Sequence, residues 1–291
     1  MIPSLFIRTK MTPHTYTTCQ LAADLGFKSA QELRSFAQKS NGMYRWYKRL
    51  KDKEHPENGT RIITPPSKEL KAVQRALLEK VLYLIKTPDI MGGGRGSSTK
   101  NIMKVHVGKP MILCYDISNF FPSVSYVDVK SALRDRGFSR DVANIITRLV
   151  TLNGHLPQGA PCSTQIAKLI LMKPAAHLIR LLKAFGKSVN ITFWVDDIII
   201  SGPASLKNIE TSGHNNVYNI FSRYGLTLKK CKTRVCPASA EQEALGIRVD
   251  HNSLEPCSGF MKKYHDEVKS NGRDSKKARG MRSYIDFINK P

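Results

Sequence analysis

The chain has 291 residues, of which 41% are hydrophobic, so it can bury a sizeable core as one large domain or a few packed subdomains. Lys and Arg total 46 against 23 Asp and Glu, which gives a formal net charge of +23. Such an excess repels itself unless an anionic partner offsets it, and the phosphate backbone of nucleic acid is the usual partner. An acidic membrane surface and a ribosome-type structural role stay open as alternatives.

Several classes of protein are disfavoured by what the sequence lacks. No run of about 18 apolar residues occurs, so we expect no membrane span and no membrane partner. The first ten residues lack the apolar stretch of a secretory signal. The six cysteines form no Cys-x-x-Cys pair, which argues against a zinc ribbon, and Cys114 and Cys162 are expected to be small buried side chains. We therefore expect a reduced, cytoplasmic protein.

Apolar spacing and turn residues predict the elements in chain order. Helices are expected at residues 17–39 (divided near Gly26), 68–86, 127–136, 140–150, 164–182 (with Pro174 as a kink or boundary) and 215–224. Strands are expected at residues 61–63, 110–115, 189–194, 198–201, 226–235 and 244–249, and a Gly-rich loop at 92–98. The last 31 residues are basic and are expected to be helical. The order strand, helix, hairpin, helix, strand predicts an α+β fold with helices on one face of the sheet, rather than a parallel doubly wound sheet.

Three aspartates stand at the ends of expected apolar strands. Asp116 follows the strand 110–115, and Asp196-Asp197 lies at the tip of the hairpin formed by 189–194 and 198–201. Adjacent aspartates repel, so such a pair costs stability without a cation. Two metal ions about 4 Å apart need several bridging carboxylate oxygens, which acids on neighbouring strands can supply. This pattern indicates a two-metal centre.

Each part of this pattern also has an ordinary explanation. An Asp-Asp dipeptide often marks a solvated turn, and Asp116, shortly before Ser118-Asn119, can simply cap a turn. The stretch 156–161, Leu-Pro-Gln-Gly-Ala-Pro, combines a rigid proline with a glycine that permits close approach to a ligand, but it can also be a plain loop entering the helix at 164. The functional interpretation depends on all of them occurring together.

Six motifs in order resemble the reverse transcriptase series from the fingers to the primer grip. They are Arg61-Ile62-Ile63-Thr64-Pro65-Pro66, Asp116-Ile117-Ser118-Asn119-Phe120-Phe121-Pro122-Ser123, Leu156-Pro157-Gln158-Gly159-Ala160-Pro161, Trp194-Val195-Asp196-Asp197, Lys230-Cys231-Lys232-Thr233 and Ala244-Leu245-Gly246. The resemblance covers roughly residues 20–290. It implies an RNA-directed DNA polymerase with a right-hand fold of fingers, palm and a short helical thumb.

The resemblance assigns the residues that bind metal and perform catalysis. Asp116, Asp196 and Asp197 look like the metal-binding triad for two Mg²⁺ ions, with Mn²⁺ as a substitute. Lys232 looks like the lysine that donates a proton to pyrophosphate, although Lys229 and Lys230 remain alternatives within the same cluster.

Further residues look like contacts to the incoming nucleotide and the template. Arg61 looks like the fingers arginine on the triphosphate, where a bidentate guanidinium suits a phosphate group. Phe121 looks like the aromatic gate that excludes a 2′-hydroxyl and so selects dNTPs. Gln158 and Gly159 look like the nucleotide and template contact loop. The alternatives are a surface charge for Arg61 and a core aromatic for Phe121.

Within the family, the sequence is most similar to bacterial retron reverse transcriptases. The segments 21–26 and 70–75 and the cluster around Tyr44 carry this likeness. Retron enzymes also have an Asn-Ala-x-x-His element, for which the segment from Asn101 to His106 is available with altered spacing. Three features depart from the family: Trp194-Val195 replaces Tyr-Ala, 244–246 replaces Val-Thr-Gly, and the thumb is short.

The resemblance further implies an organisation and partners. We expect N-terminal helices and fingers at 1–109, palm at 110–125, a helical fingers insertion at 126–156, palm at 157–247, and an RNA-binding thumb at 248–291, with no RNase H or endonuclease segment. Expected partners are a structured noncoding RNA that serves as template and primer, its short DNA product (msDNA), dNTPs, and a retron effector protein in phage defence. Candidate RNA-binding residues are Lys262, Lys263, Lys276, Lys277, Arg279 and Arg282.

Other assignments stay open at this stage. A group II intron-like or another defence-associated bacterial reverse transcriptase would share the motifs. A catalytically inactive RNA-binding relative would keep the fold, although it would not require the aspartates, Phe121 or Gln158. An RNA-dependent RNA polymerase has the same palm, but the bulky Phe121 argues against it. The basic residues of the thumb can also be a solvated helical face.

Overall fold

The computed structural model describes residues 15–51, 56–186, 188–211 and 216–290. These residues form two compact units. The first, here called the helical unit, comprises the described parts of 15–88 and 119–175. The second, here called the sheet unit, comprises the described parts of 89–118 and 176–290. The first ten residues, for which no secretory signal was expected, lie outside the described part.

The helical unit begins its helices where hydroxyl groups can cap them. Thr17 forms a capping box with Gln20 at the start of α1, and serines cap the helices that follow by accepting a backbone N–H three residues on. The helices are α1 (Thr18–Leu25), α2 (Ala30–Lys39), α3 (Lys68–Lys80), α5 (Phe120–Ser123), α6 (Tyr126–Asp135), α7 (Arg140–Val150) and the first part of α8 (Ser163–Leu182). Gly26 ends α1 at φ +85°, as expected for a helix divided there.

Two expectations for these helices need correction. The helix expected to reach residue 86 ends at Lys80, and a short 3₁₀ turn at Leu82–Leu84 follows. Pro174 lies inside α8 and does not end it, although it cannot donate the backbone hydrogen bond of a helix interior. Further 3₁₀ turns lie at Ser40–Met43, Pro56–Asn58, Lys104–His106, Lys183–Phe185, Ala204–Thr211 and Lys230–Lys232.

The helical unit also carries a two-stranded hairpin. Strand β2 (Thr60–Ile63) was expected, but its partner β1 (Tyr47–Leu50) was not, because its aromatic and basic residues hide the alternation of a strand. The strands are antiparallel, with Arg49 opposite Arg61 and Lys48 opposite Ile62. All of β1 and most of β2 are exposed, so the hairpin presents both of its faces to solvent.

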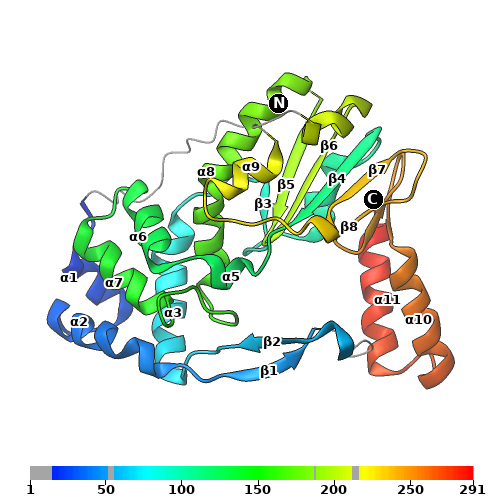
Figure 1. Ribbon diagram of the computed structural model, residues 1–291. Helices are drawn as coiled ribbons and strands as arrows, with labels where there is room; N and C mark the ends of the chain where they lie inside the picture. The colour runs from blue at the N-terminus through cyan, green and yellow to red at the C-terminus, as the bar shows by residue number, and fades with distance from the viewer. Residues whose placement is uncertain (1–14, 52–55, 187, 212–215, 291) are drawn as a thin grey trace. The chain divides into compact units, whose positions relative to one another are not determined.

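The sheet unit is built on five strands in the order β3-β5-β6-β4-β7 (Figure 1). The strands are β3 (Met91–Gly92), β4 (Met111–Asp116), β5 (Asn190–Trp194), β6 (Asp197–Gly202) and β7 (Arg234–Pro237). All neighbours are antiparallel except β3 and β5. The central strands are apolar because both of their faces are covered, and β4 is buried along its whole length. The expected strand before Asp116 and the expected hairpin after it are both present.

Two expected strands of this unit are wrong in part. Residues 226–235 do not form one strand: Leu228 makes an isolated antiparallel bridge to Ile117, the chain turns at Lys230–Lys232, and β7 begins only at Arg234. Residues 244–249 belong to a hairpin of β8 (Gln242–Ala244) and β9 (Ile247–Val249), which is joined by Leu245 at φ +55° and Gly246 at φ +73°. Positive φ at both turn positions matches the right-handed twist of a tight hairpin.

A second, small sheet and the last helix cover one face of the central strands. Strand β10 (Leu254–Pro256) completes a small antiparallel sheet with β8 and β9, and helices α10 (Ser258–Asn271) and α11 (Lys276–Asn289) follow. Ile112, Cys114 and Ile199 pack in one apolar cluster with residues of β8, β9, β10 and α11. Helices α4 (Thr99–Met103) and α9 (Val217–Ser222) are also in this unit; the helix expected from residue 215 starts within the described part at Val217.

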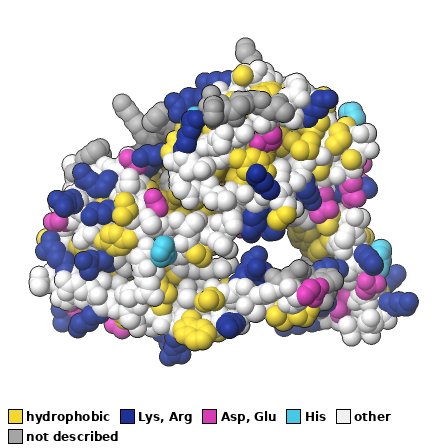
Figure 2. Space-filling view, viewed as in Figure 1, with side chains coloured by type: hydrophobic (Ala, Val, Ile, Leu, Met, Phe, Trp, Pro, Cys, Tyr) yellow, Lys and Arg dark blue, Asp and Glu magenta, His cyan; other side chains and the backbone are white. Residues whose placement is uncertain are grey.

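Other expectations concern the molecule as a whole. Cys114 and Cys162 are buried, as expected, and all six cysteines are free. Across the described ranges, no helix is long and apolar enough to cross a membrane. Lys and Arg side chains are spread over the surfaces of both units and are not confined to one helix (Figure 2).

Candidate active site

The three candidate aspartates meet at one end of the central strands. Asp116 ends β4 and lies directly opposite Asp197, which begins β6. Asp196 stands in the two-residue turn between β5 and β6, and its carbonyl oxygen accepts the N–H of Ile117 at 2.9 Å. Carboxylates placed directly opposite on neighbouring strands repel each other. The sheet therefore holds like charges together at this edge.

The turn that carries Asp196 is strained. Trp194 pairs with Asp197, so Val195 and Asp196 are the only two residues of the turn, and Val195 has φ +57°. Such a turn normally has glycine at the first position, because a β-branched residue is rarely found at positive φ. Conformations of this kind cost on the order of 1–3 kcal/mol and persist only where the surrounding structure imposes them.

Trp194 is accommodated by a glycine on the neighbouring strand. Gly92 of β3 is in register with Trp194 of β5. A Cβ atom at residue 92 would overlap the indole ring and would lie 2.8 Å from Cγ1 of Ile102. The family's usual tyrosine is therefore replaced here by a larger ring, and Gly92 supplies the space. This first glycine of the expected Gly-rich loop belongs to a strand.

Two lysines bind the carboxylate of Asp116. Lys229 Nζ lies 2.9 Å from Oδ1, and Lys232 Nζ lies 2.7 Å from Oδ2. The backbone also fixes this pairing, because the N–H of Lys229 donates to the carbonyl oxygen of Asp116 at 2.9 Å. Lys230 is turned away, with Nζ 6.0 Å from the ring centre of Tyr218. Within the cluster that sequence reasoning could not resolve, Lys232 and Lys229 reach the site.

The aspartates differ in their electrostatic surroundings. Burial, together with the charges of Asp196 and Asp116, raises the pKa of Asp197 to about 6. Burial alone would also raise the pKa of Asp116, but the ammonium groups of Lys232 and Lys229 outweigh it and hold that pKa below its usual value. The lysines thus offset the negative charge of Asp116 far better than that of Asp197.

The donor set suits a divalent metal in kind but not in its present arrangement. Carboxylate oxygens are the ligands that Mg²⁺ and Mn²⁺ prefer, and burial with two neighbouring carboxylates keeps the pKa of Asp197 raised even though the charges of Lys232 and Arg234 lower it. Within the described ranges, however, no three His, Cys, Asp or Glu side chains converge on a metal-sized site. Asp116 is directed at its two lysines instead.

Tyr218 on α9 holds the turn that presents these lysines. Its hydroxyl lies 2.5 Å from Oγ1 of Thr233, and Thr233 donates to the carbonyl oxygen of Lys229 at 3.3 Å. Because Thr233 has one proton to donate, Tyr218 is then the donor to Thr233. The Tyr218 ring also packs edge-on against Tyr115, which precedes Asp116 on β4.

His106 supports the two hairpin strands from inside the sheet unit. The ring is fully buried, with Nδ1 2.7 Å from Ser201 Oγ on β6 and Nε2 2.7 Å from Thr192 Oγ1 on β5. Burial, with a smaller contribution from Lys109, lowers the pKa of His106 to about 3. This histidine, singled out from the family pattern, is a structural link between β5 and β6.

The remaining candidate residues lie in the helical unit. The carbonyl oxygen of Gln158 accepts the N–H of Thr64 at 2.8 Å, which fastens the loop to the end of β2. Gly159 has φ +108°, and a Cβ atom there would lie 2.8 Å from Cγ2 of Ile63. Glycine is therefore required at residue 159 both by the backbone and by the close contact. The structure brings Gln158, Gly159 and β2 together as the motifs indicated.

The face of the hairpin that carries Ile63 also carries two arginines. Arg61 is exposed, and Arg49 lies directly opposite on β1. Directly opposed like charges are unfavourable in a hairpin unless an anion offsets them. Arg49 was missed by sequence reasoning because β1 was not recognised, although a strand partner for Arg61 would have revealed it.

Phe121 is only partly buried, whereas its neighbour Phe120 is in the core. The two rings are tilted with centres 5.9 Å apart. Asn119, at φ +46°, precedes the single helical turn that carries both. Phe120 therefore serves as the core aromatic, and the ring of Phe121 keeps an exposed edge.

A groove of about 540 Å³ lies on the opposite face of the hairpin. Its residues include both cations and apolar groups: Asn41, Tyr44, Arg45, Trp46, Lys48, Ile62, Thr64, Leu152 and Asn153. Trp46 is 68% exposed and Ile62 is 58% exposed, which is unusual for such large apolar side chains. None of the described residues that line this groove is acidic, so its electrostatic preference is for an anion.

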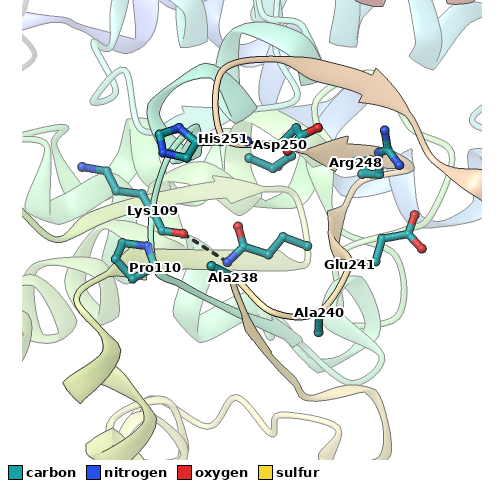
Figure 3. Close-up of a pocket in the computed structure, with 11 residues that line it drawn as sticks. Lys109, Pro110, Ala238, Ala240, Glu241, Arg248, Asp250 and His251 are labelled. Carbon is teal, nitrogen blue, oxygen red and sulfur yellow. Dashed lines mark hydrogen bonds between the residues drawn. The ribbon is translucent and has the colours of Figure 1, made fainter.

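A second cavity, of about 410 Å³, is remote from the aspartates. Figure 3 shows Lys109, Pro110, Glu241, Arg248, Asp250 and His251 around it, and Gln242 donates to the carbonyl oxygen of Lys109 at 3.1 Å. Residues 108–110 precede β4, so this cavity lies at the start of β4, whereas Asp116 lies at its end. At 3.3 Å per residue the two are about 20 Å apart. It is not part of the candidate active site.

The candidate thumb residues are all exposed on α10, α11 or the segment between them. They differ in their partners. Lys277 Nζ lies 3.0 Å from the buried carboxylate of Glu267, whereas Arg282 donates to the carbonyl oxygen of Arg273 at 2.8 Å. Lys277 therefore already has an anionic partner within the helix pair.

Comparison with known families places this geometry in context. The model of the reverse transcriptase (RNA-dependent DNA polymerase) family matches residues 50–249. Retron Se72 reverse transcriptase from Salmonella heidelberg (strain 579083-10) is 32% identical over 211 residues, which cover 70% of this chain and 55% of that protein. Retron Ec86 reverse transcriptase from Escherichia coli is 26% identical over 262 residues, which cover 88% of this chain and 80% of that protein. The expected likeness to retron reverse transcriptases is confirmed.

Solved structures agree at the level of fold. The apo telomerase from Candida tropicalis has a TM-score of 0.56 at 10% identity, covering 84% of this chain and 52% of that chain. A form truncated from its C-terminal domain has a TM-score of 0.54 at 10% identity, covering 76% and 55%. The likeness supports the expected α+β right-hand polymerase fold. The match to the Se72 protein leaves almost half of that relative's length uncovered.

Proposed function

Because this chain belongs to the reverse transcriptase family, we propose that it copies RNA into DNA with Asp116, Asp196 and Asp197 as its catalytic acids. The observation that carries the proposal is the position of three aspartates at the adjoining ends of β4, β5 and β6, where like charges lie close together against their repulsion. Aspartates with a purely structural role would not need to be held together against this repulsion.

The reaction joins a primer 3′-oxygen to the α-phosphorus of a dNTP and breaks the bond to pyrophosphate. Bound divalent ions, two Mg²⁺ or Mn²⁺, would lower the pKa of the hydroxyl and neutralise the triphosphate. Asp116, Asp196 and Asp197 would hold these ions. Lys232, which lies at the site beside Lys229, would donate a proton to the leaving pyrophosphate, and it is exposed enough to reach solvent.

Residues of the helical unit would bind and select the nucleotide. Arg61 would bind the triphosphate, and Arg49 beside it would add a second guanidinium to the same anion. The exposed edge of Phe121 would contact the sugar and exclude a 2′-hydroxyl. Gln158 and Gly159 would contact the nucleotide and template, since the loop is fastened to β2 beside the arginines.

Contacts to RNA would extend beyond the reaction centre. Template RNA approaching the site would stack a base on Trp46 in the groove that also presents Arg45 and Lys48. The exposed basic residues of α10 and α11 would bind a stem of the same RNA. The similarity to retron enzymes supports a structured noncoding RNA as template and primer, a short msDNA product, and an effector protein in phage defence.

The test is magnesium-dependent dNTP incorporation by the purified protein with its copurified nucleic acid. Wild type should incorporate dNTPs, and D196N/D197N should lose at least about a thousandfold in rate, since metal ions supply several kcal/mol of transition-state stabilisation. Equal incorporation by both proteins would contradict the mechanism. Phe121→Ala should admit ribonucleotides that wild type excludes, and sequencing of the bound RNA would identify the template.

A further inference from the structure

We propose that Lys229 and Lys232 are the resident counter-cations of Asp116, and that this carboxylate exchanges them for a divalent metal ion. The inference rests on the proposed function, because it takes Asp116 to be a metal ligand. It goes beyond that function by giving both lysines a role before any reaction starts. It also explains why carboxylates of the right kind do not converge on a metal-sized site within the described ranges.

Each oxygen of Asp116 faces one lysine, but only Lys232 donates a hydrogen bond, whereas buried Oδ1 has an ion pair with Lys229 and no hydrogen-bond partner among the described residues. Lys229 binds Oδ1 at 2.9 Å and Lys232 binds Oδ2 at 2.7 Å, while the Asp116 side chain is only 10% exposed. A metal ion that bound either oxygen directly would meet an ammonium group in the same place. Two like charges within a few ångströms of one another, in a partly buried site, repel strongly. Metal and lysines therefore compete for one carboxylate.

The lysines are presented to Asp116 by the fold and not by chance. The N–H of Ser118 donates to the carbonyl oxygen of Thr227 at 2.7 Å, and the N–H of Lys229 donates to that of Asp116 at 2.9 Å. Tyr218 and Thr233 hold the turn from its other side. Because the backbone is fixed, the exchange requires only that two flexible side chains move, and both of them can extend into solvent, since Lys229 is 32% and Lys232 is 52% exposed.

The exchange links metal binding to the position of the lysines. In the metal-free state the two ammonium groups neutralise Asp116, which offsets the repulsion between it and Asp197 across β4 and β6. When metal takes the carboxylate, both ammonium groups are released near the aspartates. The lysine proposed to serve the leaving pyrophosphate thus becomes free only in the metal-loaded site.

The test measures metal affinity and metal-free stability, with no nucleic acid present. Mn²⁺ is titrated by calorimetry into the full-length wild type, Lys229→Met and Lys232→Met, which keep the side-chain length and remove the charge. Lys230→Met is the matched control, because it removes the same charge from the same turn and Lys230 lies over Tyr218. Each of the first two variants should bind Mn²⁺ about two- to fivefold more tightly than wild type, the range of a partly exposed ion pair.

A second readout distinguishes exchange from a general change in charge. Without metal, Lys229→Met and Lys232→Met should melt at a lower temperature than Lys230→Met, and saturating Mn²⁺ should remove that difference. If all three lysine variants bind Mn²⁺ with the same affinity, the proposal is wrong. Asp116→Asn separates the two levels of inference: if it weakens Mn²⁺ binding while the lysine variants match the control, only the exchange fails. If Asp116→Asn binds Mn²⁺ as wild type does, the metal assignment of the proposed function fails as well.

Discussion

The two hairpins that carry the candidate acids and the candidate arginines are built in opposite ways. The hairpin of β5 and β6 is flanked by β3 and β4, its inner residues are buried, and its turn contains Val195 at a strained φ. The hairpin of β1 and β2 pairs with no third strand in the described part of the chain and is exposed along almost its whole length. A two-stranded hairpin alone is marginally stable in water, whereas a central strand pair is fixed on both sides.

This difference matches the task that we propose for each hairpin. Carboxylates that hold metal ions must be placed to within a fraction of an ångström, so strain and burial are tolerated in order to fix them. Arginines that gather a triphosphate act at longer range through charge, and an exposed hairpin can adapt to the ligand. The comparison predicts that changes to the hairpin of β1 and β2, here called the exposed hairpin, affect nucleotide binding. Changes to the hairpin of β5 and β6, here called the inner hairpin, should affect stability and the placement of the aspartates.

The largest effect is expected at the exposed hairpin. Arg61→Ala should raise KM for dNTPs by about 10- to 100-fold, since a charge-assisted hydrogen bond contributes roughly 1.5–3 kcal/mol. Arg49→Ala should act in the same direction, because Arg49 shares that face. Steady-state kinetics measure both. Lys68→Ala removes one exposed charge from α3 of the same unit, outside both the hairpin and the groove, and is the control. An equal rise in KM for Lys68→Ala would show that total charge, and not the hairpin face, determines nucleotide binding.

The next effect is expected at the inner hairpin. Gly92→Ala should lower the free energy of unfolding by about 1–3 kcal/mol, because the added methyl group overlaps Trp194 and the neighbouring strands cannot give way. Chemical denaturation measures it. Gly259→Ala, near the start of α10, meets no atom within 4 Å and should leave stability unchanged or raise it by up to about 1 kcal/mol. If both variants behaved alike, Gly92 would not be what accommodates the indole.

A smaller effect links the inner hairpin to pH. His106 is buried and neutral between β5 and β6, and its pKa falls from 6.5 to about 3 on folding. The unfolded chain therefore binds more protons between these two values, so stability is complete above pH 6.5 and declines as the pH falls below it. The contribution of His106 should fall by about 1.4 kcal/mol between pH 7.5 and 5.5. Asp197, whose pKa is raised to about 6, acts in the opposite direction in this range, so the comparison with a His106 variant isolates the histidine.

Denaturation at several pH values tests this expectation. His106→Gln should lower stability overall, since its side chain cannot reproduce both hydrogen bonds, and should flatten the decline between pH 6.5 and 5. His251→Asn changes an exposed histidine of the same unit and is the control. The expectation is contradicted if the His106→Gln profile keeps the slope of wild type.

Sequence patterns were sufficient where one physical requirement dominates. Apolar runs before Asp116 and around Asp196-Asp197 predicted the central strands, and apolar spacing predicted most of the longer helices. β1 was missed because an exposed strand rich in Lys, Arg and Tyr has no buried face to reveal its period. The turns at residues 230–232 and 245–246 were missed because their tertiary contacts, and not local propensity, bend the chain there.

The candidate site divides in the same way. The three acids were proposed from their positions at strand ends and from the motif series, both of which can be read along the chain. The pairing of Asp116 with Lys229 and Lys232 could not be predicted, because it depends on a turn more than 110 residues away in sequence. Likewise, nothing local to Gly92 indicates that it borders Trp194, which lies on a strand about 100 residues later.

The smallest effect is expected on the helix pair α10 and α11, where two neighbouring lysines should differ. Lys277 is paired with the buried carboxylate of Glu267, whereas Lys276 is exposed and makes no ion pair among the described residues. If this surface binds RNA, Lys276→Ala should weaken binding by about twofold and reduce the salt dependence by roughly one counterion.

Lys277→Ala should instead lower stability by a few tenths of a kcal/mol up to about 1 kcal/mol, because it leaves Glu267 without its cation. RNA affinity at several salt concentrations and thermal melting of both variants separate the two roles. An unchanged salt slope in Lys276→Ala would mean that this lysine is a solvated charge. An unchanged melting temperature in Lys277→Ala, with a reduced slope, would mean that RNA and not Glu267 is its partner. The two variants thus show whether the cations of this helix pair bind a ligand, as we propose for those of the exposed hairpin. In both regions a charge can bind a ligand only where the fold has not already neutralised it.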